Sequence, residues 1–316
     1  MKILIVSGFL GAGKTTFIKE LIRRTGKYFV VLENEYGEND LDSRTLKNSG
    51  ELEILEFMEG CVCCTKKDSF VNTILSISAA IDPEFLIVEP TGIGKLGNII
   101  DNIKKIQYEK ITLLPPIVVL SPRSIMSNLR DYPEIYKDQI IYADNVVFTK
   151  CENDDSNSLS QAADIIHTLN PSASVLTNHY TLQNVEWWNT LLSDTKKNDV
   201  SLASYDKVSQ NKDDFQQVSL HHVKMSNIAE LIVLLEDTLR AEFGQIARAK
   251  GVLKVGYEFL HFDLADGLYG IISEESLEPK TQCVFIGKEI NKDKLFHRLN
   301  TDSKCEEKEH CSHHHH

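Results

Sequence analysis

The chain has 316 residues, of which 42% are hydrophobic, and its formal net charge is −12. This length and apolar content suit one large or two medium-sized packed domains. The negative charge excludes a global basic field that would attract nucleic acid or an anionic membrane, and no apolar run reaches the roughly 20 residues of a membrane-spanning helix. We expect a cytoplasmic protein without a nucleic-acid or membrane partner, whose seven cysteines are reduced thiols or metal ligands.

The first predicted element is a buried strand over residues 3–6, which are all apolar. Residues 8–16 read GFLGAGKTT and match the phosphate-binding pattern G-x-x-x-x-G-K-[ST] at every fixed position. Apolar residues at helical spacing follow over 17–22. A strand, a glycine loop and a helix in this order direct the helix N-terminus at an anion, so we predict that the chain binds a nucleoside triphosphate. Since the strand begins at residue 3, we expect no signal peptide.

The residue types of this loop match the expected chemistry. Gly8 and Gly13 let the backbone turn its N–H groups toward phosphate oxygens, in conformations that a Cβ would obstruct. Lys14 is placed to contact the β- and γ-phosphates, and Thr15 offers a hydroxyl to Mg²⁺. The expected nucleotide-binding residues of the loop are Gly8, Gly11, Ala12, Gly13, Lys14, Thr15 and Thr16.

Strands and helices alternate through the rest of the N-terminal half. Apolar, β-branched runs predict strands over 28–32, 85–88, 116–120, 145–148 and 174–177, and helical periodicity predicts helices over 70–80 and 159–169. Buried strands that alternate with helices form a mostly parallel sheet flanked by helices. The predicted fold class is therefore α/β, with a P-loop NTPase domain over residues 1–185 and a smaller C-terminal α+β domain.

Glu89 follows the predicted strand 85–88 directly. An acidic residue at this place in a P-loop protein holds a magnesium-bound water or orients the attacking water. We predict that Thr15 and Glu89 bind Mg²⁺ and that Lys14 and Glu89 are catalytic. Gly92 is expected to bring its N–H close to the γ-phosphate. The alternative for Glu89 is an exposed glutamate at a strand end.

Thr149-Lys150-Cys151-Glu152 follows the predicted strand 145–148. GTPases commonly read guanine with [NT]-K-x-D at such a position: the lysine lies against the base, and the acid accepts hydrogen bonds from N1–H and N2–H₂. Thr149, Lys150 and Glu152 match this pattern loosely, with Glu where Asp is usual. We expect these three residues to bind the base and to favour GTP over ATP, and a polar strand-to-helix loop is the alternative.

A cysteine cluster, Cys61-Val62-Cys63-Cys64, lies between the glycine loop and Glu89. Three thiols suit Zn²⁺ or Co²⁺, and three protein ligands leave a fourth position open, as a transferable metal requires. P-loop GTPases carry their switch segments in this span of the chain, so the nucleotide state is expected to alter metal affinity. Buried apolar cysteines and a redox dithiol are the alternatives.

The C-terminal half is predicted as three parts. Residues 186–214 contain polar stretches and are expected to form a linker or long loop. Residues 215–300 are expected to form the α+β domain, with helices over 228–240 and 291–299 and strands over 251–255, 257–262 and 282–286. Residues 301–316 form a polar, flexible tail with soft metal ligands, unless its histidine run is a purification tag. The tail ligands are Cys305, His310, Cys311, His313, His314, His315 and His316.

Five motifs together resemble those of the CobW-type metallochaperone GTPases. They occur in the order GFLGAGKTT (8–16), NEYG (34–37), GCVCC (60–64), EPTG (89–92) and RAKG (248–251). The resemblance is strong over residues 1–180 and weaker over 215–300, and GCVCC is its most specific element.

The resemblance implies GTP hydrolysis with Mg²⁺ and delivery of a transition metal, such as zinc or cobalt, to a client protein. It implies that Cys61, Cys63 and Cys64 bind this metal, with Glu35 as a further oxygen ligand. Two other readings stay open: a nucleotide-responsive metal buffer or sensor, and a small-molecule P-loop kinase with structural cysteines. The expected partner is a metal-receiving client, and a homo-oligomer stays open.

Overall fold

The computed structural model describes residues 1–33, 52–56, 67–108, 110–193, 215–274, 279 and 281–299, and for residues 52–56 and 67–69 it describes the backbone only. The chain divides into two compact units, Met1–Asp213 and Asp214–His316. Each unit has its own sheet and its own hydrophobic core.

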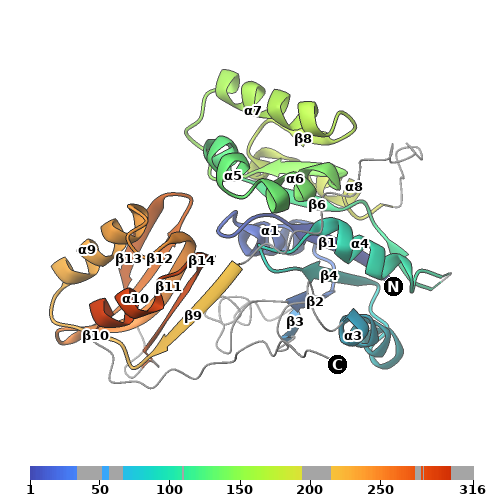
Figure 1. The fold of residues 1–316 in the computed structure, drawn as a ribbon. Helices are drawn as coiled ribbons and strands as arrows, with labels where there is room; N and C mark the ends of the chain where they lie inside the picture. The colour runs from blue at the N-terminus through green and yellow to red at the C-terminus, as the bar shows by residue number, and fades with distance from the viewer. Residues whose placement is uncertain are drawn as a thin grey trace, which may run out of the picture. The chain divides into compact units, whose positions relative to one another are not determined.

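The first unit is an α/β fold (Figure 1). Its strands are β1 (Lys2–Ser7), β2 (Phe29–Glu33), β3 (Leu52–Glu56), β4 (Phe85–Glu89), β5 (Thr112–Leu113), β6 (Ile117–Leu120), β7 (Asn145–Phe148) and β8 (Ser174–Leu176). Its helices are α1 (Lys14–Thr25), α3 (Lys67–Ala80), α4 (Leu96–Lys104), α5 (Ile125–Asp131), α6 (Pro133–Ile141), α7 (Ser156–Leu169) and α8 (Val185–Thr190), with short 3₁₀ turns at Pro122–Ser124 and Tyr180–Leu182.

The described strands of this unit pair in the order β3-β2-β4-β1-β6-β7-β8, with β5 beside β1. Every pairing between them is parallel. The order reverses at β1, and in parallel sheets ligands bind beyond the carboxyl ends of the strands at such a point. The sheet confirms the predicted fold class for this unit and places the glycine loop after β1 at that point.

Helices cover both faces of this sheet. α1 contacts α8, while α3, α4, α6 and α7 contact one another in succession. Right-handed crossovers between parallel strands explain the two groups, since the chain crosses the sheet in one direction through α1 and in the other through α3 to α7. β1, β2, β4, β6 and β7 are almost wholly buried on both faces, which is why they read as nearly continuous apolar runs.

The segment from residue 186, which the sequence predicted as the start of a linker, begins with a helix in the structure. It holds α8, whose N-cap residue Asn184 accepts a hydrogen bond from the Trp187 N–H at 3.0 Å. Trp188 is fully buried, and its ring centroid lies 5.4 Å from that of Phe17 on α1. The prediction of a linker or long loop is therefore wrong for residues 186–190, because a helix this short shows no clear periodicity and is stabilised by its tertiary contacts. Residues 194–214 lie outside the described part of the chain.

The second unit is an α+β fold with an antiparallel sheet. Its elements are β9 (Phe215–His221), β10 (Lys224–Met225), α9 (Ile228–Leu239), β11 (Gln245–Val255), β12 (Glu258–Ala265), β13 (Leu268–Ser273), β14 (Gln282–Lys288) and α10 (Lys292–Leu299). The sheet order is β13-β12-β11-β14-β9, with β10 beside β11. α9 and α10 pack on one face of the sheet and form the core of this unit with it (Figure 1).

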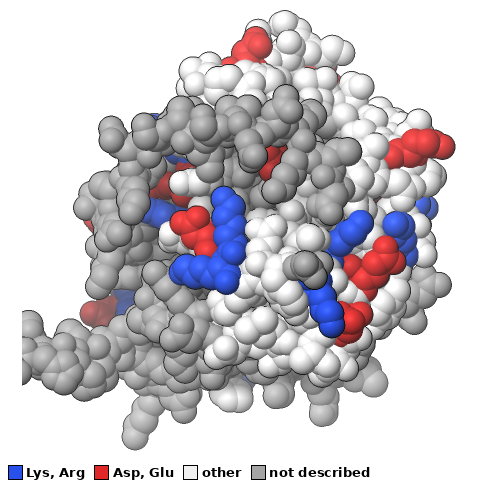
Figure 2. All heavy atoms as spheres, turned by 90° about the vertical axis from the view of Figure 1, so that its right-hand side faces the viewer, with Lys and Arg blue, Asp and Glu red and all other residues white. Residues whose placement is uncertain are grey.

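Among the described residues on the face that Figure 2 shows, basic and acidic side chains are interspersed, and neither kind forms a continuous field. Among the helices of the described residues, none combines the length and the apolar character that crossing a membrane would need.

Candidate nucleotide-binding site

The glycine loop joins β1 to α1 and leaves the helix N-terminus uncapped. Gly13 is the N-cap residue of α1 with φ 89°, a left-handed conformation that favours glycine, and no described side chain caps this end. The N–H groups of the first helical turn and the helix dipole therefore favour an anion here. Gly11 lies in the loop with φ 74°, and Thr16 is exposed on the first turn of α1.

Gly8 lets β1 and the loop pass close to the neighbouring strand. A Cβ at Gly8 would lie 2.3 Å from the Val119 carbonyl oxygen, and its φ of 151° is also unfavourable for other residues. The loop therefore starts from a fixed point on the sheet, which supports the expectation that its first glycine is required.

Lys14 folds back over the loop. Its side chain is buried, and Nζ donates hydrogen bonds to the Gly8 carbonyl at 3.3 Å and to the Phe9 carbonyl at 3.5 Å. A buried ammonium group is costly unless it is paired, and these carbonyls hold it at the mouth of the loop. The charge is thus placed where a phosphate bound by the helix N-terminus would meet it.

Thr15 and Glu89 come together from different elements. β1 and β4 are parallel neighbours, so the loop after β1 and the end of β4 lie at the same edge of the sheet. The Thr15 Oγ1 hydroxyl donates to Glu89 Oε1 at 3.0 Å. A hydroxyl and a carboxylate are the oxygen ligands that Mg²⁺ prefers, so this pair fits the ion that a P-loop nucleotide site requires.

Glu33 was missed by sequence reasoning, although it has the same signal as Glu89. Each glutamate ends a strand of apolar residues, and the two are in register on the adjacent strands β2 and β4. Residues in register on neighbouring strands point to the same face of the sheet. Glu33 is buried, so the structure places a second carboxylate on the strand next to Glu89.

The loop after Glu89 packs against the glycine loop. A Cβ at Gly92 would lie 2.6 Å from the Leu10 backbone nitrogen, so only glycine allows this approach. Gln139 of α6 is buried, and its Nε2 donates to the Gly92 and Gly94 carbonyls, each at 3.1 Å. No motif marks Gln139 in the sequence, because its role depends on a contact between distant segments.

The predicted base-reading loop follows β7 and is tied to the phosphate loop. Thr149 Oγ1 donates to the Ala12 carbonyl at 2.7 Å and lies 3.2 Å from the Leu120 carbonyl. Lys150 is exposed with φ 55°, and the Glu152 side chain is 62% exposed. Both polar side chains can therefore reach a ligand.

Two contacts at the far end of this loop were also missed by sequence reasoning. Arg123 Nη2 lies 2.6 Å from Asp154 Oδ1, and His179 Nε2 lies 3.2 Å from Glu152 Oε1.

Burial raises the pKa of the Cys151 thiol to about 11, so this cysteine is protonated at neutral pH and unreactive.

The predicted ligands of the transition metal lie outside the described residues. They are Glu35, Cys61, Cys63, Cys64, Cys305, His310, Cys311, His313, His314, His315 and His316. Within the part of the chain that the structure describes, no group of three or more His, Cys, Asp or Glu residues is arranged to hold a metal ion.

The parallel sheet, the glycine loop and the Thr15–Glu89 pair define a P-loop nucleotide-binding protein. Residues 2–177, more than half of the chain, match the family model of the CobW/HypB/UreG nucleotide-binding domain. The chain therefore belongs to the CobW/HypB/UreG family, as its motifs led us to expect.

Three relatives show how far the similarity extends. The zinc chaperone YeiR of Escherichia coli K12 is 34% identical over 154 residues, which cover 47% of this chain and 46% of that protein. The zinc-regulated GTPase metalloprotein activator 1 of Schizosaccharomyces pombe is 29% identical over 190 residues, which cover 56% of this chain and 46% of that protein. The matches thus span about half the length of these two relatives. The zinc chaperone YjiA of Escherichia coli K12 is 23% identical over 309 residues, which cover 93% of this chain and 96% of that protein.

Proposed function

We propose that the protein is a GTP-hydrolysing metallochaperone that couples binding and hydrolysis of Mg–GTP to the binding and delivery of a transition metal. The observation that carries this proposal is the 3.0 Å contact between Thr15 Oγ1 and Glu89 Oε1, which joins the phosphate-loop helix to the end of β4. Thr15 and Glu89 would both bind Mg²⁺, and the cysteine-rich segment lies between them in the sequence. This arrangement supports a switch in which the state of the bound nucleotide alters the metal affinity of that segment.

The described residues of the site would each have a separate role in GTP hydrolysis. Lys14 and the N–H groups at the start of α1 would stabilise the negative charge of the phosphates. Thr15 and Glu89 would hold Mg²⁺, which supplies charge neutralisation between the β- and γ-phosphates when it is bound. Thr149 and Lys150 would place the base, and Glu152 would accept the hydrogen bonds of guanine N1–H and N2–H₂.

Zinc is the transported metal that the relatives favour. Two of the relatives described above are zinc chaperones, and the third is a zinc-regulated GTPase. Cys61, Cys63 and Cys64 lie in the chain between Thr15 and Glu89, and thiolates bind Zn²⁺ and Co²⁺ well. In this proposal the metal is cargo for a client protein.

A zinc competition titration in the presence of Mg–GTP, Mg–GDP or no nucleotide tests the proposal, with phosphate release measured in parallel. We expect zinc affinity to differ about tenfold or more between the GTP and GDP states, a coupling free energy in the usual allosteric range. Cys64→Ala should lose this zinc site but keep GTP binding. Thr15→Ala should lose the effect of nucleotide on zinc, because Mg²⁺ loses a ligand.

Thr25→Ala is the matched control, since Thr25 lies at the opposite end of α1 and its hydroxyl bonds the Leu21 carbonyl. Its zinc and GTP affinities should equal those of the wild type. Equal zinc affinity in all three nucleotide states would exclude coupled delivery and leave a metal buffer. Transfer of the γ-phosphate to an acceptor other than water would instead identify a kinase.

A further inference from the structure

The loop that is expected to read the base lies beside a second strand end. β7 and β8 are parallel neighbours, with Val147 opposite Leu176. Glu152 follows β7, and His179 follows β8, so both side chains lie at the carboxyl edge of the sheet. His179 Nε2 lies 3.2 Å from Glu152 Oε1, and the His179 side chain is only 11% exposed, against 62% for Glu152.

The contacts of Nδ1 show which of the two ring nitrogens of His179 carries the proton. The Thr181 backbone N–H donates to His179 Nδ1 at 3.4 Å, and Thr181 Oγ1 lies 2.7 Å from the same atom. Nδ1 must therefore be an acceptor, and the proton of the neutral ring is on Nε2. His179 thus donates its Nε2–H to the Glu152 carboxylate.

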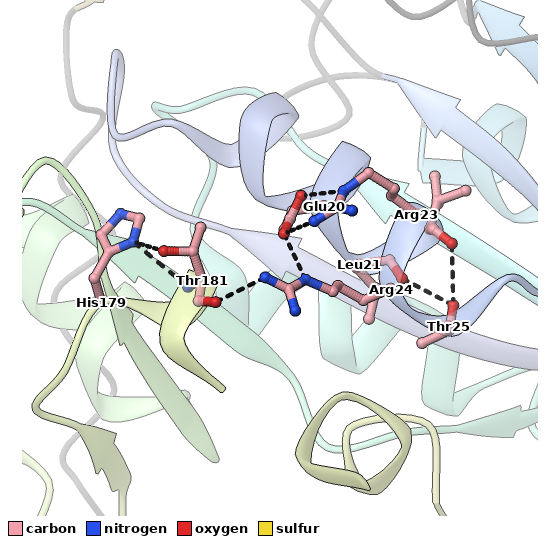
Figure 3. A network of polar contacts seen from close by, with 8 residues as sticks. Glu20, Leu21, Arg23, Arg24, Thr25, His179 and Thr181 are labelled. Atoms are coloured by element: carbon pink, nitrogen blue, oxygen red, sulfur yellow. Dashed lines mark hydrogen bonds and ion pairs between the residues drawn. The ribbon is translucent and has the colours of Figure 1, made fainter. Parts of the chain in front are cut away.

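The helix that begins at the phosphate loop fixes the turn that carries His179 (Figure 3). Arg24, in the last turn of α1, donates from Nη2 to the Thr181 carbonyl at 2.7 Å and from Nε to Glu20 Oε1 at 2.7 Å. The hydrogen bond from Arg23 is the main cause that lowers the pKa of Glu20 to about 2, so Glu20 is charged at neutral pH and holds Arg24 in place.

The His179 ring is also held by an aromatic contact. Its centroid lies 4.3 Å from that of Tyr180, and the Tyr180 ring meets the buried Phe17 of α1 edge-on at 5.3 Å. The imidazole is therefore fixed before any ligand binds. A side chain must be held in this way if it is to orient another side chain.

We propose that His179 is a positioning residue for purine selection: it holds Glu152 where its carboxylate accepts the N1–H and N2–H₂ groups of a guanine. Glutamate has one more rotatable bond than the aspartate usual at this position, and an exposed side chain costs conformational entropy to fix. The Nε2–H of His179 reduces that cost and uses one of about four acceptor positions of the carboxylate. The inference rests on the proposed binding of GTP.

Equilibrium binding of GTP, ITP and ATP to the full chain, measured by calorimetry with Mg²⁺, tests this role. Inosine keeps N1–H but lacks the N2 amino group, and adenine lacks both donors. We expect the wild type to bind in the order GTP, ITP, ATP. His179→Phe keeps a ring on Tyr180 but removes the donor, and it should weaken GTP binding about tenfold, as for a hydrogen bond to a charged group, with ATP affinity unchanged.

Two further variants separate positioning from folding. His179→Gln places an amide N–H as many bonds from the backbone as Nε2, and it should restore most of the GTP preference. His167→Ala removes an exposed histidine from α7 and should bind all three nucleotides as the wild type does. In a Glu152→Ala background, His179→Phe should have no additional effect on the ratio of GTP to ATP affinity.

The outcomes distinguish this inference from the proposed function. A wild type without preference for GTP over ATP would refute guanine recognition, and with it the role of His179. A wild type that prefers GTP, combined with a His179→Phe variant that keeps the preference or loses GTP and ATP affinity equally, would overturn the positioning role alone.

Discussion

Asp138 is a buried carboxylate on α6 that contacts the first turn of α4. Its Oδ1 accepts a hydrogen bond from the Gly97 N–H at 3.2 Å, and it lies one residue before Gln139, which holds the loop after Glu89. Burial raises the pKa of Asp138 to about 6, although the Gly97 hydrogen bond opposes the rise. The charged form of Asp138 is thus less favoured in the folded protein than in the unfolded chain.

The Asp138 pKa predicts a pH-dependent stability. The folded value of about 6 lies above the roughly 3.9 of an unfolded aspartate. The folded state therefore binds the proton more tightly, and stability falls as the pH rises from about 4 through 6. We expect Asp138→Asn to raise the free energy of unfolding by about 1–2 kcal/mol at pH 8 and by little at pH 4.

Urea denaturation at the two pH values measures this difference. Asp164→Asn makes the same charge change at an exposed position of α7 and should show no such pH dependence. A gain from Asp138→Asn that is equal at pH 4 and pH 8 would mean that ionisation of this carboxylate is not its source.

At the scale of elements, α8 is short but contributes to the core of the first unit. Trp188 packs on Phe17 of α1 and meets Tyr180 edge-on at 5.9 Å between ring centroids. Leu191 and Leu192, directly after the helix, belong to the same core cluster. α1 therefore carries the phosphate loop at its N-terminus and is covered by α8 on its outer side.

Truncation of Trp188 should test this contribution. Trp188→Ala leaves a large cavity beside α1, and we expect a loss of about 3–5 kcal/mol in the free energy of unfolding. Trp188→Phe keeps most of the apolar volume and should cost clearly less. Trp187→Ala is the matched control, because Trp187 is only partly buried. Similar losses for Trp187→Ala and Trp188→Ala in chemical denaturation would contradict the packing assigned to α8.

At the scale of the whole molecule, the two units have separate cores. The described core of the first unit is formed by its parallel strands with helices such as α1, and that of the second unit by its antiparallel sheet with α9 and α10. A unit with its own core and complete sheet can fold alone. The described residues of the candidate nucleotide site all belong to the first unit.

A chain of residues 1–193 should therefore fold cooperatively and bind GTP as tightly as the full chain does. A chain of residues 1–183 lacks α8 and is the matched control, which we expect to lose stability and to expose its core to a hydrophobic dye. Thermal unfolding and GTP titration measure both properties. If the longer piece failed to fold, the first unit would need the second for its stability.

Sequence reasoning succeeded where a residue acts through its local segment. β1, β4 and β7 are apolar on both faces, so they are visible as uninterrupted runs in the sequence. It did not predict the burial of Trp188, because the polar residues around α8 made this segment resemble a linker. It also missed Gln139 and His179, since neither lies in a motif and each acts on a segment far away in the chain.

The sequence by itself determines that this chain has a phosphate-binding loop on a parallel α/β sheet, because the loop pattern and the buried strands are local properties of consecutive residues. Only the tertiary structure decides that Thr15 meets Glu89, that Gln139 holds the loop after Glu89, and that His179 donates to Glu152. These contacts join residues on different elements, so they exist only after the parallel strands have brought their carboxyl ends to one edge of the sheet.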